Sequence, residues 1–231
     1  MKVPSKKNAF TLVEVLVVIV VLGVLMSILL PTLSKAKLTS KRTRSIANQK
    51  QISIGYNSYL HDNRGTYPQV WGFAAVGGKL GNLTNSFKVP PNAPPGFDIN
   101  QVAIFYGATT PPDDRPLNEY ISNNYKVFHD PMDIGGTFLN IDSCFEAFGN
   151  SYQPQVADDM FRVKRVLGES SEKKGSYEAT SMTLKEINRS PKNKIIQGDF
   201  NWPFDGADTW HAAKEQAGHV ILFGDGHAEY F

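Results

Sequence analysis

The sequence of 231 residues predicts an α+β fold in which one long N-terminal helix packs against a small antiparallel β-sheet head with long irregular loops. Residues 10–30 form an apolar run that is long enough for a helix, and an apolar stripe at helical spacing follows it. Near the C-terminus, Asp225-Gly226 lies between two short apolar runs, which favours a β-hairpin. The segment between these two ends is rich in Gly and Pro, which predicts loops.

Residues 10–30 are predicted to form a transmembrane helix. Seventeen of these 21 residues are Phe, Leu, Ile, Val or Met, and Glu14 is the only ionisable one. A helix of this length covers about 30 Å, the thickness of the hydrocarbon core of a bilayer. Each apolar side chain contributes roughly 0.3–0.6 kcal/mol to insertion, against about 3 kcal/mol for a carboxylate at mid-membrane, so insertion is favoured. An acidic side chain inside such a segment indicates a functional role for Glu14. The question is then which positive group pairs with it.

Residues 31–62 are predicted to continue as an amphipathic stem helix that ends near His61. Their apolar side chains recur at i, i+4, i+7 and i+8 and form one stripe, which consists of Ile52, Tyr56, Tyr59 and Leu60. Pro31 removes one backbone hydrogen bond, which predicts a kink. The residues from Asn63 to Pro68 include Gly65 and supply the break after the helix.

Residues 63–231 are predicted to form a globular, β-rich head. Residues 68–118 hold 14 of the 33 Gly and Pro residues, so we expect an irregular surface with short strands at 70–76 and 101–106. The C-terminal hairpin is expected to turn at Asp225-Gly226, so that Phe223 pairs with Ala228, Ile221 pairs with Tyr230, and all four side chains share one face. Ile195-Ile196 is expected to add a third strand, and the sheet is expected to pack on the stem stripe.

Charge is distributed unevenly along the chain. Residues 1–61 carry a net charge of +8 and residues 62–231 a net charge of −6. An acidic head argues against nucleic-acid binding by charge alone. Cys144 is the only cysteine, so no intrachain disulfide can form and the core must hold the head together.

Acidic and histidine side chains gather near the C-terminus, which raises the possibility of a metal site. The group within 29 residues consists of Asp199, Asp205, Asp208, His211, His219, Asp225 and His227. None of these has HExxH, HxH or CxxC spacing, and the chain contains no GxSxG, Walker or dinucleotide glycine pattern. The sequence therefore predicts that the protein is not an enzyme and needs no cofactor. A structural calcium ion on Asp carboxylates stays open, with no ligands assigned.

The N-terminus carries a short basic leader at residues 1–9, with three lysines and no acidic residue. A cut before Phe10 would create an ammonium group one helical turn from Glu14. Here the sequence resembles the type IV prepilin family, which includes the pseudopilins of type II secretion. The resemblance lies in Lys6-Lys7-Asn8-Ala9 followed by Phe10-Thr11-Leu12-Val13-Glu14. The alternative is a simple signal anchor in which Glu14 meets only the positive end of the helix dipole.

The resemblance implies a pilin-like fold and a processing pathway. Prepilin peptidase would cut between Ala9 and Phe10, the new amine would be methylated, and Glu14 would pair with the Phe10 amine of a neighbouring subunit. Thr11 and Leu12 belong to the same processing motif. Pilin helices carry a proline at the offset of Pro31, which would act in assembly together with Phe10 and Glu14. The family usually has Gly where this chain has Ala9.

The C-terminal part resembles a pseudopilin subgroup with an H-X9-DG motif. The similar pieces are residues 115–133, 149–152 and 184–200, together with the end of the chain. The motif would comprise Asp225, Gly226 and either His211 or His219. The spacing departs from the subgroup, because His211 lies 14 positions before Asp225 and His219 only 6.

Two signals disagree on the orientation in the membrane. Three lysines precede the span, and five basic residues follow it at 35–44, so counting charges alone places the leader outside. The resemblance implies the opposite: a single-pass protein of the bacterial inner membrane, with the leader in the cytoplasm and the head exported to the periplasm or cell exterior.

These observations favour a structural subunit of a type II secretion or type IV pilus-type envelope filament. Its expected partners are prepilin peptidase, neighbouring pilin-like subunits, inner-membrane lipid and the secretion or pilus assembly machinery. The alternative is a membrane-anchored adhesin or ligand-binding head that never polymerises.

Overall fold

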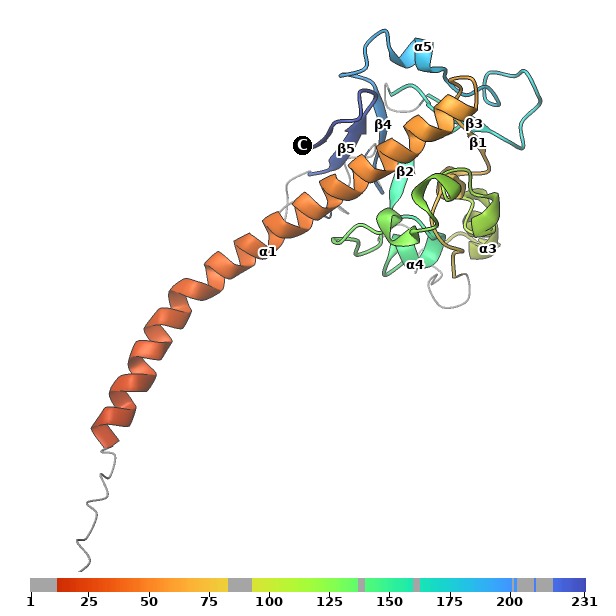
Figure 1. Cartoon of the computed structure of the whole chain (residues 1–231). Helices are drawn as coiled ribbons and strands as arrows, with labels where there is room; N and C mark the ends of the chain where they lie inside the picture. Colours follow the sequence, from red (N-terminus) through yellow and green to blue (C-terminus); the bar gives the residue numbers. More distant parts are fainter. Residues whose placement is uncertain are drawn as a thin grey trace, which may run out of the picture. The chain divides into compact units, whose positions relative to one another are not determined.

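The computed structural model describes residues 12–82, 93–136, 140–159, 163–200, 202, 210 and 218–231. The chain divides into two compact units, Met1–Ser40 and Lys41–Phe231, and the boundary falls inside the first helix. Figure 1 follows the chain from the N-terminal helix to the C-terminal strands.

Helix α1 runs from Leu12 to Asp62 and includes Pro31. It therefore contains residues 12–30 of the apolar run and the predicted stem. Three hydroxyl groups near Pro31 bond back to carbonyl oxygens of the preceding turn: Ser27 to Val24, Thr32 to Ile28 and Ser34 to Leu30. These bonds satisfy the hydroxyls within the helix, as an apolar environment requires. The helix ends where Gly65 donates to the Leu60 carbonyl with a positive φ of 70°, in agreement with the predicted break.

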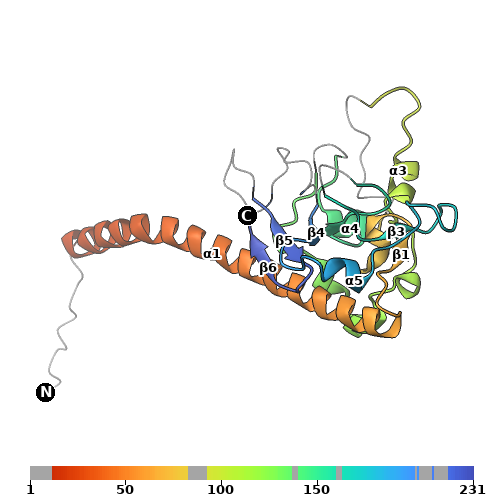
Figure 2. The ribbon, with the colours of Figure 1, turned by 90° about the horizontal axis from the view of Figure 1, so that it is seen from above.

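The head is built on a four-stranded antiparallel sheet of order β2-β4-β5-β6. Its strands are β2 (Tyr152–Pro154), β4 (Ile195–Asp199), β5 (Val220–Phe223) and β6 (Ala228–Tyr230). The predicted third strand at Ile195-Ile196 is confirmed as β4. In Figure 2, β5 and β6 lie along the part of α1 that follows Lys41. The predicted fold of a long N-terminal helix and a small antiparallel sheet with loops is confirmed, and this layout is pilin-like.

The predicted register of the C-terminal hairpin is wrong by one residue. Val220 pairs with Tyr230, and Leu222 pairs with Ala228. The loop has three residues instead of two, because Gly226 donates to the Phe223 carbonyl and adopts a φ of 83°. A one-residue shift moves alternate side chains to the opposite face. Leu222 and Ala228 therefore enter the main core, while Ile221 and Phe223 pack with Trp202 in a separate cluster.

The Gly- and Pro-rich region contains more helix than predicted. Strand β1 covers only Gln69–Val70, where it pairs in parallel with β3 (Gly168–Glu169), and the 3₁₀ helix η1 follows at Phe73–Val76. The expected strand at 101–106 is wrong, because this segment belongs to helix α3 (Ile99–Phe105). The Asp98 side chain accepts a hydrogen bond from Asn100 N and caps this helix.

Short helical turns complete the head. They are the 3₁₀ helices η2 (Pro112–Asp114), η3 (Glu119–Ile121) and η4 (Tyr125–Phe128) and the α-helices α4 (Cys144–Phe148) and α5 (Leu184–Ile187). Helix α5 begins with a capping box between Thr183 and Glu186.

The main core forms where α1 meets the sheet. Ile52, Tyr56 and Leu60 are at most 2% exposed and pack with residues of β2, β4, β5 and β6. The predicted apolar stripe is therefore the face that the sheet covers, with Tyr59 packed at its margin. A second cluster includes Phe73, Cys144, Phe148 and Trp210.

Candidate membrane and assembly segment

The first half of α1 presents an apolar surface. Leu12, Ile28 and Leu30 are 83%, 66% and 65% exposed, and the apolar residues between them are about half exposed or more. By length and composition α1 is able to cross a membrane, and none of its most apolar stretch is buried within the chain. Leaving such a surface in water would forfeit roughly 25 cal/mol per Å² of apolar area. The segment therefore fits a bilayer or a bundle of similar helices.

Two of the predicted processing residues lie within the described part of the chain. Leu12 begins α1, and Glu14 occupies its first turn. A carboxylate at this position meets the positive end of the helix dipole. Ala9, Phe10 and Thr11 lie outside the described residues, as does the rest of the leader.

The predicted C-terminal motif residues do not form one site in the described part of the chain. His219 precedes β5, and its Nδ1 lies 2.6 Å from Asp199 Oδ1 in a buried pair. Asp225 and Gly226 follow β5 at its other end, where Asp225 accepts a hydrogen bond from His227 N. Each set therefore supports its own end of the strand. His211, the other candidate, lies outside the described residues.

Among the residues that the structure describes, no three His, Cys, Asp or Glu side chains lie close enough together to hold a metal ion. Asp205, Asp208 and His211 of the predicted acidic and histidine group lie outside these residues. The Asp225 carboxylate contacts the His227 ring, which stacks on Phe223 with centroids 4.4 Å apart. The described members of the group thus make structural contacts in pairs.

Polar contacts between α1 and the head were not predicted from the sequence. Buried Ser45 donates to Asp130 Oδ2 at 2.5 Å, and Asn48 donates to the His129 carbonyl at 2.9 Å. Gln49 accepts from Gln197 Nε2 at 2.7 Å, and Gln197 in turn accepts from Tyr56. The available signal was that Ser45, Gln49 and Ser53 continue the buried face at spacings of four residues.

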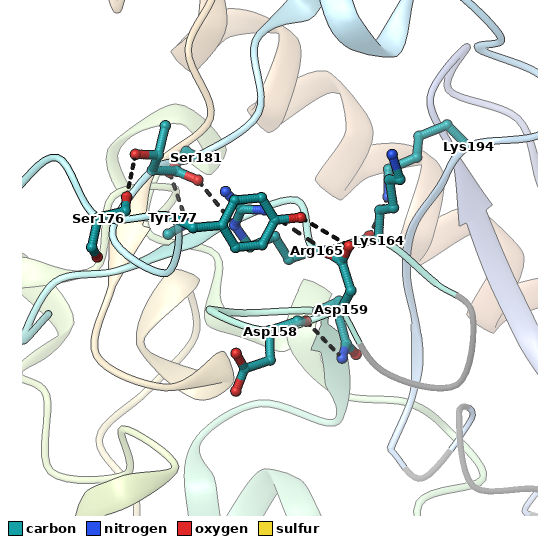
Figure 3. Close-up of polar contacts among 11 residues, drawn as sticks. Asp158, Asp159, Lys164, Arg165, Ser176, Tyr177, Ser181 and Lys194 are labelled. Carbon is teal, nitrogen blue, oxygen red and sulfur yellow. Dashed lines mark hydrogen bonds and ion pairs between the residues drawn. The ribbon is translucent and has the colours of Figure 1, made fainter.

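Figure 3 shows a second polar cluster, which ties the loop before β4 to the rest of the head. The Arg165 guanidinium lies 3.3 Å from the Tyr177 ring centroid, and the Tyr177 hydroxyl donates to Asp159 Oδ2 at 2.8 Å. Desolvation raises the pKa of Asp159, but hydrogen bonds from Arg165 N and Tyr177 outweigh it and lower the pKa below its ordinary value. Lys194 also joins this cluster by donating to the Lys164 carbonyl.

The comparison with protein families places the N-terminal segment in a class. Residues 4–30 match the model of the prokaryotic N-terminal methylation motif, and the match includes Ala9, Phe10 and Glu14. This motif indicates a precursor of the type IV pilin-like or pseudopilin class, and it implies processing by prepilin peptidase and assembly with pilin-like subunits. The comparisons with curated proteins and with solved structures give no match.

Proposed function

We propose that this protein is a pilin-like structural subunit of an envelope filament of the type II secretion or type IV pilus class. It is inserted into the bacterial inner membrane as a single-pass precursor and cleaved before Phe10, and its head faces the periplasm or the cell exterior. The observation that carries the proposal is an exposed apolar helix with Glu14 in its first turn, directly after the leader within the methylation motif. The C-terminal resemblance favours the H-X9-DG pseudopilins within this class.

In this proposal, Glu14 sets the register between neighbouring helices. Glu14 lies near the start of the span, so its carboxylate costs less than the roughly 3 kcal/mol of a mid-membrane position, and a positive partner would offset this cost. Cleavage before Phe10 supplies such a partner, because the new ammonium group of one subunit can reach Glu14 of the next. At an effective dielectric constant of 20, charges about 4 Å apart attract by about 4 kcal/mol, so correct pairing outweighs neighbouring registers. Pro31 is proposed to shape the same packing surface.

Replacing Glu14 tests this mechanism. Glu14→Ala should leave the chain in the membrane fraction, because the apolar run is unchanged, and should abolish filament assembly measured by cross-linking and electron microscopy. Val18→Ala, one turn further along α1, is the matched control and should retain both properties. Normal assembly of Glu14→Ala would refute the pairing. An intact mass that corresponds to a chain starting at methylated Phe10 would support the processing step. A mass that corresponds to a chain starting at Met1 would contradict it.

A non-polymerising anchored adhesin or ligand-binding head is the second candidate. It is favoured by exposed aromatic side chains on the head, with Trp71 48% and Phe105 70% exposed. Cysteines introduced into residues 10–30 distinguish the two. Cross-links between copies in the membrane support the filament subunit, and their absence together with correct processing supports the anchored head.

A further inference from the structure

We propose that the basic segment of α1 that follows the apolar run binds anionic lipid headgroups at the membrane surface where the head emerges. This basic segment consists of Lys35, Lys37, Lys41 and Arg44. The inference rests on the proposed insertion of residues 10–30, and it adds a lipid class as a partner of the unassembled subunit.

The first observation is the position of these charges along the helix. Leu33 lies three residues beyond the apolar run and is 63% exposed, and Lys35 and Lys37 follow it on α1. At 1.5 Å per residue they lie about 3 and 6 Å beyond Leu33. The headgroup layer on each side of a bilayer is roughly 5–7 Å thick. Both ammonium groups therefore fall at headgroup depth, and Lys41 and Arg44 follow within about a Debye length of the surface.

The second observation is the lack of compensating acidic residues. Between Val15 and His61 the sequence contains no Asp or Glu, although six Lys or Arg residues lie there. Lys37 and Lys41 are four residues apart, and like charges at this spacing destabilise an isolated helix. A solvated helix normally mixes both signs along its surface. Anionic headgroups would relieve this repulsion.

The third observation concerns direction. Two residues apart on a helix, Lys35 and Lys37 point to nearly opposite sides of α1. A docked protein covers one side of a helix, whereas a lipid leaflet surrounds it. Arg42 is excluded from the basic segment because its guanidinium lies 4.0 Å from the Tyr230 ring centroid and donates to the Tyr230 hydroxyl at 3.1 Å. The arrangement therefore favours a lipid surface over the acidic head of a second copy.

Lipid selectivity of the full chain tests the inference. The protein is reconstituted in phosphatidylcholine vesicles that contain spin-labelled phosphatidylglycerol or spin-labelled phosphatidylcholine, and electron spin resonance measures the lipid that the protein immobilises. The wild type should immobilise phosphatidylglycerol about threefold more than phosphatidylcholine, because each basic residue at the surface attracts anionic lipid. This preference should decline as salt is raised to about 0.5 M.

Three triple variants with the same loss of charge locate the effect. Lys35→Gln/Lys37→Gln/Lys41→Gln should remove most of the preference, with Arg44 left in place. Arg64→Gln/Lys185→Gln/Arg189→Gln, in the head, should retain it, and Lys2→Gln/Lys6→Gln/Lys7→Gln should retain most of it. Full preference in the first variant, or its loss in the leader variant alone, overturns the proposal. If Lys41 cross-links to the head of another copy and the protein shows no preference for phosphatidylglycerol, the basic segment binds a second copy. This result would also overturn the proposal. Immobilisation of neither lipid would instead show that residues 10–30 fail to insert.

Discussion

Arg115 is a cation buried in the head, where it joins residues of η1, of α4 and of the segment 107–110. It is 1% exposed, and its guanidinium donates to carbonyl oxygens that include Ala74 at 2.6 Å, Gly77 at 3.1 Å and Phe148 at 3.2 Å. Burial lowers the pKa of Arg115 from its ordinary value to about 10, so it stays charged at neutral pH. A planar group with five donors can satisfy several carbonyls at once, which suits a region that has little regular structure.

Replacing Arg115 should therefore destabilise the head strongly. We expect Arg115→Met to lower the free energy of unfolding by about 3 kcal/mol or more, because several buried carbonyls lose their donor. The measurement is urea unfolding of the full chain in detergent, followed by tryptophan fluorescence. Arg189→Met, at an exposed position, should change stability by no more than about 0.5 kcal/mol. A similar small effect at both positions would show that the carbonyls find other donors.

Lys194 should contribute a pH-dependent term to stability. Burial lowers its pKa from 10.5 to about 8, with Asp159 opposing and Lys164 and Arg165 adding to the shift. Between these two values the unfolded chain binds a proton that the folded chain does not, so stability rises with pH. Above about pH 10.5 this contribution is complete, and it is lost as the pH falls through 8.

Comparison with Lys194→Met isolates this contribution. Between pH 8 and 10.5 the wild type should gain about 1–2 kcal/mol of unfolding free energy relative to Lys194→Met, a figure reduced from the full shift because the side chain is partly exposed. Urea unfolding at several pH values measures the difference. Parallel pH profiles for the two proteins would argue against a lowered pKa at Lys194.

At the scale of elements, the hairpin of β5 and β6 turns at a glycine that lies against α1. Gly226 has a φ of 83°, and a Cβ there would lie 2.8 Å from Ser53 Oγ on α1. Gly175 has a similar φ of 88°, but a Cβ there would meet nothing within 4 Å. An alanine at either position would have a strained backbone, but only the alanine at Gly226 would also contact α1.

We expect Gly226→Ala to cost about 2–3 kcal/mol and Gly175→Ala about 1 kcal/mol, since both force alanine into the left-handed region but only the first also crowds α1. Removing the Ser53 hydroxyl should reduce the cost of Gly226→Ala to that of Gly175→Ala. Urea unfolding of the single variants and of Ser53→Ala/Gly226→Ala measures these values. Equal costs for Gly226→Ala in both backgrounds would exclude the contact with Ser53.

The same hairpin shows how far local patterns predict structure. Its existence follows from a turn dipeptide between apolar runs, but Gly224-Asp225-Gly226 permits a two-residue or a three-residue loop. The three-residue loop lets Leu222 and Ala228 enter the core beneath α1. Tertiary packing therefore determined the register. At α3, Asp98 is a helix-capping residue that could have been recognised from the sequence. The nearby Gly and Pro residues favoured loops and short strands instead, so the helix was not predicted.

The candidate site likewise has features that the sequence predicts and features that depend on tertiary packing. The apolar run and Glu14 could be identified from sequence, because the thickness of a membrane sets the length of the segment and its composition. The contact between Ser45 and Asp130 joins residues 85 positions apart. No local periodicity reports such a pair, because it exists only after the sheet has packed on α1.

For the molecule as a whole, the orientation in the membrane is the property to test. Our proposal places the leader in the cytoplasm, whereas the five basic residues after the span favour the opposite orientation by the charge rule. In spheroplasts of cells without prepilin peptidase, Ser40→Cys should react with an impermeant maleimide, and Ser5→Cys should react only after permeabilisation. Wild-type Cys144 is fully buried and serves as the unlabelled control. The reverse pattern would place the head in the cytoplasm.

The buried position of Cys144 also bears on how the head matures. The thiol is 0% exposed within an aromatic cluster, and the sequence holds no second sulfhydryl with which it could bridge. No intrachain disulfide therefore has to form after translation. A head of this kind needs neither a disulfide oxidase nor a disulfide isomerase to mature, and reductants that dismantle bridge-stabilised secreted proteins should leave it folded.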